Sequence, residues 1–493
     1  TVEHVTISNV NITGDWNVGA LAGGLMGHVE NIEASGTVNG NGSRVGGLVG
    51  QHVDVDNLDN SSPLVFTWNG QKYEYVADVG DQLPKETSGE DLTQIDNTSL
   101  VAKDGKYSMK IAQEYNEIVY YDQLSLSTFD HAPGYTVVEP INRSAGHDDL
   151  RTVSDTPTNP LQSCTDMYNN DCKDDLVSND EKWGYEDKSF NQCWTLNFGD
   201  LSAAATTNVQ LLMRGARDYT KTPTTKMRSI QVKNTDGTWK EIYNKNDIGS
   251  DATPRLRSID LTNKFVANDY HVKVCLDTWQ MNYFAIDTSA QVPFTEHVYQ
   301  PTTADLQYHG FTAIDRTHYP NHDYDQVSDR PEGNLRTQYG NFTKYGEVKP
   351  LLEDQDDHFV VMRYGDQMSV DFPYEAPADG LERSFILNNN ALYKHANLGQ
   401  IGRVADSPMP YRGMGTFDAN THYPQTDENL AYLAEWNTRY YNGNEQTGGS
   451  TIIDSSADVA VTSYGCAIGG LVGFKRKPMI GSSALGNVEG HCD

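Results

Sequence analysis

Hydrophobic positions at both ends of the chain recur in short runs separated by Gly and Asn. Near the start, apolar and polar residues alternate in Val5-Thr-Ile7 and Val10-Asn-Ile12, and glycine-rich phrases follow. Alternation with a period of two predicts half-buried β-strands, and glycine predicts tight turns between them. Short strands and turns at a regular spacing indicate the stacked coils of a β-solenoid.

One glycine-rich phrase occurs three times. The copies are Ala22-Gly-Gly-Leu-Met-Gly27, Val45-Gly-Gly-Leu-Val-Gly50 and Ile468-Gly-Gly-Leu-Val-Gly473. The first two copies, aligned on Gly24 and Gly47, lie 23 residues apart, and we take this distance as the length of one coil. We expect a single repeat array, formed by residues 1–55 and 451–493, that carries a large inserted region.

These phrases match the GLUG motif, which is found in repeats of bacterial adhesins and secreted surface proteins. Three copies with similar flanking residues carry the resemblance. It implies a structural or adhesive scaffold outside the cell and implies no chemistry. The chain begins and ends within such repeats, so we expect it to be part of a longer polypeptide.

The inserted region also reads as β-structure. Asn69-Gly70 joins two alternating runs, Leu64–Trp68 and Lys72–Val76, which is the strongest short signal for a β-hairpin. We expect residues 63–190 to form a β-rich subdomain with a polar, cysteine-bearing loop. Short strands with turn residues between them predict a jelly-roll-like β-sandwich over residues 191–290.

Residues 300–445 are expected to form a further β-rich subdomain with one short helix. The helix is predicted over residues 427–440, with Thr426 as its N-cap. Its apolar face is predicted to comprise Leu430, Leu433, Ala434 and Asn437. The predicted fold class is therefore all-β, with β-solenoid-like repeats at both ends that flank a β-sandwich region.

The central region, residues 63–442, resembles the C-terminal region of secreted bacterial proteins of the cartilage acidic protein type. That group also carries FG-GAP repeats and an ASPIC/UnbV segment. The likeness rests on phrases such as Phe66–Asp78, Tyr345–Leu352 and Trp436-Asn-Thr-Arg439. The FG-GAP calcium loops are absent from this sequence, so calcium does not carry over. Asp260-Leu-Thr-Asn-Lys-Phe265 resembles a phrase of galactose-binding-like jelly rolls.

The charge balance narrows the range of partners. The chain has 493 residues, with 37 Lys and Arg against 68 Asp and Glu, so its formal net charge is −31. Binding to nucleic acid or to an anionic membrane needs a basic face, which this balance argues against. No run of 18 apolar residues occurs, so we expect no membrane span in this chain. The acidic balance suits a salty exterior, cation binding or a solvated surface.

Six cysteines point to an oxidising, extracellular location. Cys164 and Cys172 lie in a polar loop and are predicted to form a disulfide. Cys193 with Cys275, and Cys466 with Cys492, are further candidate pairs, although fifteen pairings of six cysteines exist.

Two segments have the residue types of a metal site. The first contains His318, His322, Asp323 and Asp325, and imidazole with carboxylate suits a divalent metal. The second contains Asp354, Asp356 and Asp357, whose carboxylates suit calcium, although no Asp-x-Asp-x-Asp-Gly spacing is present. The alternative for both segments is a solvated polar loop. Calcium is the candidate cofactor.

The aromatic residues raise the question of sugar binding. Trp183 and Tyr185 lie in a polar stretch and are the candidates for a glycan-stacking surface, whereas Trp194, Trp239 and Trp279 lie in or beside predicted strands and favour core packing. No Gly-x-Ser-x-Gly, His-Glu-x-x-His or P-loop occurs.

The sequence therefore predicts a non-enzymatic, extracellular structural or adhesive protein of the cell surface, which would form part of a fibre or envelope assembly. Its partners would be other copies of itself or other surface proteins, and glycans are a further candidate. The alternatives are a carbohydrate-binding module of a secreted protein and, less favoured, a secreted hydrolase.

Overall fold

The computed structural model describes these parts of the chain: residues 2–3, 5–14, 18–25, 29–30, 32–40, 45–46, 48–52, 63–79, 81–82, 91–115, 117–141, 149–177, 191–217, 228–244, 248, 254–277, 279–315, 321–328, 337–394, 403–412, 414, 422–441, 452–453, 456–463, 468–469, 472–474, 479–480, 483–484 and 488–490. The chain divides into two compact units. Unit 1 comprises residues 1–58, 329–337 and 444–493, and unit 2 comprises residues 59–328 and 338–443. Strands dominate both units, which confirms the predicted all-β class.

Unit 1 is a parallel β-solenoid built from both ends of the chain. Its coils supply the strands β1 (Val2–Glu3), β2 (Thr6–Gly14), β3 (Ala22–Leu25), β4 (Val29–Glu30), β5 (Glu33–Gly40), β6 (Val45–Gly46), β7 (Val49–His52), β36 (Ile452–Ile453), β37 (Ser456–Ser463), β38 (Ile468–Gly469), β39 (Val472–Phe474), β40 (Met479–Ile480), β41 (Ser483–Ala484) and β42 (Val488–Gly490). One sheet has the order β1-β4-β36-β40, and a second has the order β2-β5-β37-β41 with β42 also on β37. The strands form four successive coils: β1–β3, β4–β7, β36–β39 and β40–β42. The second coil and the third coil are therefore neighbours in space, although unit 2 separates them in the sequence.

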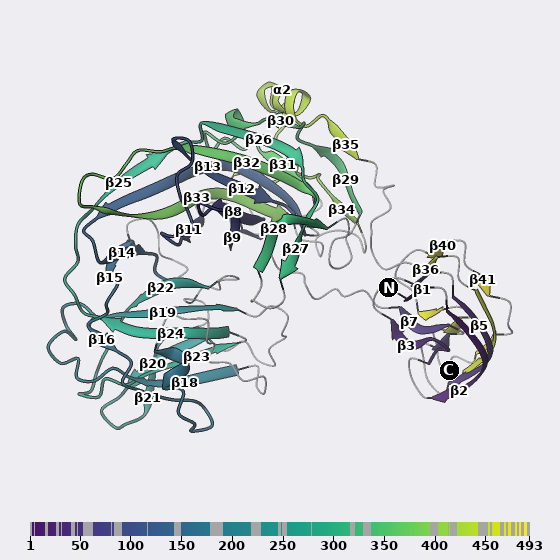
Figure 1. Ribbon diagram of the computed structural model, residues 1–493, viewed down its shortest axis with the longest axis horizontal. Coiled ribbons are helices and arrows are strands. Elements are labelled where there is room, and N and C mark those ends of the chain that lie inside the picture. Colours follow the sequence, from purple (N-terminus) through teal and green to yellow (C-terminus); the bar gives the residue numbers. More distant parts are fainter. Residues whose placement is uncertain are drawn as a thin grey trace. The chain divides into compact units, whose positions relative to one another are not determined.

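Strand β37 continues the stack directly on strand β5. The two strands are parallel and in register over eight positions, from Glu33 opposite Ser456 to Gly40 opposite Ser463. In Figure 1 the yellow strands from the end of the chain lie beside the purple strands from its start. The predicted single repeat array that is interrupted by an insertion thus agrees with the strand pairing.

The coil length differs from the predicted 23 residues. Val2 pairs with Val29 and Ala22 pairs with Val49, so one coil takes 27 residues. The third and fourth coils repeat this spacing, because Ile452 pairs with Met479. Val45 pairs with both Ile468 and Val18, so the equivalent of Val45–Gly50 in the first coil is Val18-Gly-Ala-Leu-Ala-Gly23. The alignment of Gly24 with Gly47 was therefore wrong.

A narrow apolar interior holds the solenoid together. The side chains of Val38, Val45 and Leu48 are fully buried in it, with Ile32 and Val461. Beside this interior Gly36 has a φ of +140° and lies against the backbone of Val10, where a Cβ atom would collide. Only glycine accepts both conditions at low cost, so this position fixes the close approach of neighbouring coils.

Unit 2 contains two β-sandwiches, of which the larger packs two sheets face to face. Its first sheet has the order β27 (Phe311–Asp315), β28 (Asn321–Ser328), β9 (Tyr73–Asp78), β8 (Leu64–Trp68), β12 (Lys106–Ala112), β32 (Asp366–Pro373), β26 (Thr303–Tyr308) and β30 (Gly346–Glu347). Its second sheet has the order β10 (Asp81–Gln82), β33 (Glu382–Lys394), β13 (Ile118–His131) and β25 (Phe294–Tyr299). In addition, β11 (Asp91–Ile95) pairs with β33, and β31 (Val360–Met362) pairs with β13. A short 3₁₀ helix, η2 (Lys349–Leu351), lies between β30 and β31 in the chain.

The core of the larger sandwich lies between these two sheets. Met109 of β12 and Val370 of β32 meet Tyr120 and Leu126 of β13 in one buried apolar cluster. The predicted hairpin at Asn69-Gly70 is present as β8 and β9. Gly70 has a φ of +97°, which explains the choice of glycine in this turn.

The smaller sandwich lies in the chain between β13 and β25, so it is an insertion within the larger one. One sheet contains β16 (Asn159–Pro160), β24 (Trp279–Asp287), β19 (Gln210–Arg217) and β22 (Arg255–Asp260). The other contains β17 (Ser163–Thr165), β18 (Asn191–Asn197), β23 (Val272–Asp277), β20 (Ser229–Lys233) and β21 (Trp239–Tyr243). A hairpin of β14 (Tyr135–Val138) and β15 (Arg151–Ser154), together with helix α1 (Lys173–Leu176), completes this region.

Strand pairing begins the smaller sandwich at Asn159, earlier than the predicted residue 191, because β16 pairs with β24 and β17 pairs with β18. Trp194 and Trp279 are buried in its core, as predicted. Trp239 is only partly buried, and the Lys233 ammonium group lies 4.3 Å from its ring centre.

Helix α2 (Asp427–Trp436) lies over the larger sandwich and is shorter than predicted. The Thr426 side chain accepts a hydrogen bond from the Asn429 amide, which confirms the N-cap. The predicted apolar face is wrong at Leu430, which is 44% exposed, and at Ala434, which is also exposed, whereas Tyr432 is the buried residue of the helix. The chain then forms β35 (Arg439–Tyr441), which joins β29 (Thr337–Phe342) and β34 (Arg403–Ala405) in a small sheet.

Among the described residues, no helix has the length and apolar character needed to cross a membrane.

Candidate functional site

The open edges of the solenoid are the main candidate for a functional surface. Within the described part of the chain, β2 pairs only with β5 at one end of the stack. At the other end, β41 and β42 pair only with β37. An unpaired strand edge presents a row of N–H and C=O groups that another strand can pair with. Among the described residues, the outer strands at both ends of the stack therefore present such a row of backbone groups.

Strand β2 has the features of an edge that can accept a partner. Its nine residues, Thr6–Gly14, include no charged residue and no proline. Proteins usually protect an exposed edge with lysine, proline or a distorting bulge. Of these devices, β2 carries only a bulge, where Ser8 and Asn9 lie opposite Ser35, and pairing with β5 resumes at Val10.

The stack itself shows how a further coil would bind. The Glu33 amide donates to the Val5 carbonyl at 3.0 Å, and the Leu21 amide donates to the Leu48 carbonyl at 2.8 Å. The same 27-residue spacing holds from β1 to β4 and from β36 to β40, so each coil presents the next one with an equivalent edge. Stability in such a stack comes from nearest-neighbour interfaces.

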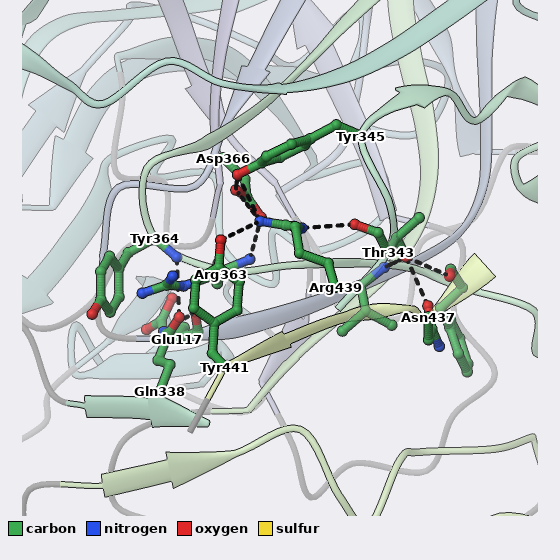
Figure 2. A network of polar contacts seen from close by, with 12 residues as sticks. Glu117, Gln338, Thr343, Tyr345, Arg363, Tyr364, Asp366, Asn437, Arg439 and Tyr441 are labelled. Atoms are coloured by element: carbon green, nitrogen blue, oxygen red, sulfur yellow. Dashed lines mark hydrogen bonds and ion pairs between the residues drawn. The ribbon is translucent and has the colours of Figure 1, made fainter. Parts of the chain in front are cut away.

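A second candidate is a buried polar network in unit 2, shown in Figure 2. Arg439 of β35 forms two hydrogen bonds to the Asp366 carboxylate, with Nη1 2.8 Å from Oδ1 and Nη2 2.5 Å from Oδ2. Tyr345 donates to the same Oδ1 at 2.9 Å, and the Arg363 amide donates to Oδ2 at 2.9 Å. The Arg363 guanidinium lies 3.7 Å from the ring centre of Tyr441.

This network is structural in character. Asp366 is buried, and its two carboxylate oxygens accept four hydrogen bonds, so its acceptor capacity is filled. Arg439 also donates from Nε to the Thr343 carbonyl at 2.9 Å. These contacts fasten β35 to the turn between β31 and β32. No signal in the sequence could have paired Asp366 with Arg439, because 73 residues separate them.

The structure places the first predicted metal segment partly in a strand. Asp323 and Asp325 belong to β28, and Asp323 accepts hydrogen bonds from the Asp325 amide and from Gln326 Nε2. His322 is in the same strand, but its side chain is outside the described parts of the structure, as is all of His318. A metal site in this segment stays a prediction.

The second predicted metal segment is a turn held by protein groups. Asp122 of β13 accepts hydrogen bonds from the amides of Asp356 and Asp357, and Asp357 accepts one from the Arg412 amide at 2.8 Å. Asp356 pairs with His358 at 2.9 Å, and Asp354 is exposed. Among the residues that the structure covers, no group of three or more His, Cys, Asp or Glu side chains is arranged to hold a metal ion. Calcium stays a prediction for this chain.

Burial changes the titration of one carboxylate beside this turn. Burial, reinforced by the neighbouring Asp357, raises the pKa of Asp122 to about 6. The Arg412 guanidinium, 3.1 Å from Asp122 Oδ2, opposes that rise. Asp122 was not predicted from the sequence, because a single Asp inside an apolar strand gives no signal of its partners.

Two of the three candidate disulfides are present. Cys164 is bonded to Cys172, as predicted, and Cys193 is bonded to Cys275 between the paired strands β18 and β23. Cys466 and Cys492 lie outside the described residues, and so do the sugar-binding candidates Trp183 and Tyr185.

Two further buried ionisable groups were not found from the sequence. Burial raises the pKa of Glu114 to about 7, although Thr312 donates hydrogen bonds to it from its amide and its hydroxyl. Burial lowers the pKa of Lys394 to about 7. The Lys394 ammonium nitrogen donates to the carbonyl oxygens of Ala405, Asp406 and Pro408, so it holds the backbone of the turn at residues 405–408 in place.

Comparison with known proteins gives a short similarity. A stretch of 58 residues is 48% identical to Halomucin from Haloquadratum walsbyi. This stretch is 12% of this chain and 1% of Halomucin. The chain thus spans only a very small part of the length of that curated relative. No protein family matches the sequence, and no solved structure matches the chain.

Proposed function

We propose that this protein is a non-enzymatic structural protein of the extracellular surface. The solenoid of unit 1 would be a spine, and unit 2 would be a folded domain displayed from it. The observation that carries the proposal is the register of β37 on β5, which makes one continuous stack from both ends of the chain. Unit 2 separates β5 from β37 in the sequence, but the two strands are still neighbours in the stack. A large domain can therefore be inserted into the repeat array without a break in the solenoid.

Three observations support the extracellular part of the proposal. Disulfides such as Cys193–Cys275 persist in oxidising compartments. The net charge of −31 keeps a protein soluble and apart from other acidic surfaces. The similar protein Halomucin is a mucin by its name, and it covers a short part of the chain.

The assembly role rests on the uncharged edge of β2. We propose that it pairs with a further coil of the same repeat type, supplied by more of the same polypeptide, by another copy or by another surface protein, and so extends the spine. The motif resemblance to GLUG repeats supports the same role. Glycan binding in a cavity of unit 2 is a second candidate function.

The test compares two variants that add the same charge at two places in the stack. Asn11→Lys with Thr13→Lys puts two lysines on exposed positions of β2, as protected edges do. Thr37→Lys with Asn39→Lys puts them at the paired positions of β5. Sedimentation and electron microscopy at rising protein concentration should show assemblies for the native chain and for the β5 variant, and at least tenfold weaker assembly for the β2 variant.

A native chain that stays monomeric at high concentration would contradict assembly between copies. Equal loss in both variants would show that added charge alone, and not the edge, controls assembly.

A further inference from the structure

Unit 2 contains a cavity that has no part in the proposed spine. It has a volume of about 340 Å³ and lies between helix α2, strand β29 and the turn that follows β34. Small-ligand sites usually have volumes of about 300–1,000 Å³ and combine apolar walls with a few fixed polar groups. This cavity is at the small end of that range.

The floor of the cavity is a buried carboxylate. Asp406 is 7% exposed and lines the cavity. Its Oδ1 accepts a hydrogen bond from the Ser407 amide at 2.6 Å, and its Oδ2 accepts one from the Asn341 amide at 2.9 Å. A carboxylate has about four acceptor positions, so Asp406 keeps about two for a ligand.

The floor is rigid before any ligand arrives. Lys394, beneath it, ties the backbone of the 405–408 turn through three hydrogen bonds of 2.8–2.9 Å. Gly340 has a φ of +118° and lies so close to the Asp406 carboxylate that a Cβ atom there would collide with it. A site held in this way binds without the cost of ordering its own side chains.

The walls and the mouth differ in character. Pro408, Met409 and Leu433 form an apolar wall, and Asn437, which is 5% exposed, lies beside it. Asn437 is fixed by hydrogen bonds with Thr343 and Tyr432, the former visible in Figure 2. At the mouth, the exposed side chains of Asn341 and Gln425 offer amides that both donate and accept hydrogen bonds.

From this arrangement we propose that the cavity binds one neutral sugar residue, with two ring hydroxyls donating to Asp406 and the C–H face of the ring against Met409 and Leu433. A hydroxyl-rich ring needs acceptors at the floor, mixed donors and acceptors at the mouth, and an apolar wall, and all three are present. An anionic sugar would be repelled by Asp406. A metal ion would find one carboxylate, that of Asp406, and one imidazole, that of His422, among the lining residues. The residues of this site all belong to unit 2, so the proposal of sugar binding does not depend on the proposed spine.

The experiment measures binding of methyl glycosides of glucose, galactose and mannose to the full chain by calorimetry or ligand-observed NMR. Glucuronate serves as the anionic comparison. We expect saturable binding of at least one neutral glycoside, at least tenfold tighter than that of glucuronate. No saturable binding of a neutral glycoside, or tighter binding of glucuronate, would overturn the proposal.

Two matched pairs of variants place the binding in this cavity. Leu433→Trp fills the cavity, whereas Leu430→Trp adds the same ring at an exposed position of the same helix. Gly340→Ala displaces the Asp406 carboxylate, whereas Gly346→Ala changes a glycine of similar φ, +112°, with no atom within 4 Å of the added carbon. Leu433→Trp and Gly340→Ala should each weaken binding at least tenfold, and Leu430→Trp and Gly346→Ala should leave it within twofold. Equal binding within both pairs would overturn the assignment to this cavity.

Discussion

At the scale of single residues, unit 2 contains a buried ion pair whose carboxylate has all its hydrogen bonds filled. The Asp366 carboxylate has no exposure of its own and is satisfied by Arg439, Tyr345 and the Arg363 amide. Such a pair adds little stability compared with an apolar core, but removal of one partner leaves the other charge buried and unpaired. The network therefore makes the position of β35 dependent on one side chain.

Replacing Arg439 by Met should lower the free energy of unfolding of unit 2 by about 3–5 kcal/mol, because Asp366 would stay buried without its counter-ion. The measurement is denaturant unfolding followed by tryptophan fluorescence. Lys344→Met is the control, since the Lys344 side chain is 42% exposed and its ion pair with Glu435 is worth at most about 1 kcal/mol. A loss below about 1 kcal/mol for Arg439→Met would show that the network does not hold β35.

Glu114 should make stability fall as pH rises. Its folded-state pKa of about 7 lies above the ordinary 4.5, so between these two pH values the folded chain binds more protons than the unfolded chain. Stability is therefore higher near pH 4.5 and declines towards pH 7, by on the order of 3 kcal/mol. Glu114→Gln should reduce the measured decline by this amount and leave the share that comes from Asp122, whose pKa is also raised, whereas the exposed Glu435→Gln should keep the whole decline. An unchanged slope in Glu114→Gln would refute the assignment.

At the scale of elements, strands and turns could be predicted from the sequence better than the partners with which they pair or pack. The hairpin at Asn69-Gly70 and the N-cap at Thr426 depend on residues close in the chain, and both are present. The coil register was missed because Val18–Gly23 lacks the double glycine of the other copies of the phrase. Only the pairing of Val18 with Val45 identifies this segment as the first copy. The helix face was missed at Tyr432, whose hydroxyl donates to the Phe359 carbonyl far along the chain.

The two disulfides of the smaller sandwich should differ in what they contribute. Cys193–Cys275 closes a loop with a sequence separation of 82, and Cys164–Cys172 closes one of 8. The loss of chain entropy in the unfolded state grows with loop length, to about 4.5 kcal/mol for the long loop against about 2.5 kcal/mol for the short loop. Replacing Cys193 and Cys275 by Ser should therefore cost about 2 kcal/mol more than replacing Cys164 and Cys172, in calorimetry of each double variant. An equal cost would contradict this account.

At the scale of the whole molecule, the chain is three nested folds. The solenoid is interrupted by the larger sandwich, and the larger sandwich is interrupted between β13 and β25 by the smaller one. The glycine-rich phrases at both ends allowed the outermost insertion to be predicted. The inner insertion could not be predicted, because β16 and β17 are two and three residues long and look like loop in the sequence.

The net charge of −31 should make the whole molecule more stable in salt. Like charges repel in the compact state, and at about 1 M ionic strength the screening length falls to roughly 3 Å. The unfolding temperature should therefore rise as sodium chloride is increased from low concentration to 1 M. A chain of the same fold with surface Asp and Glu partly replaced by Asn and Gln should show a smaller rise. An unfolding temperature that is independent of salt would contradict the argument.

The central claim is that the two ends of the chain form one stack, and hydrogen exchange of β5 tests it most directly. The measurement compares the amides of Glu33–Gly40 in the full chain and in a chain that stops before residue 451, with β12 of unit 2 as the internal reference. The account predicts that β5 is protected in the full chain and that, without β37, the β5 amides that face β37 lose that protection. Amides that donate to the first coil, such as Glu33 to the Val5 carbonyl, keep their partner, and β12 stays protected in both chains. Protection of β5 that is the same in both chains would contradict it.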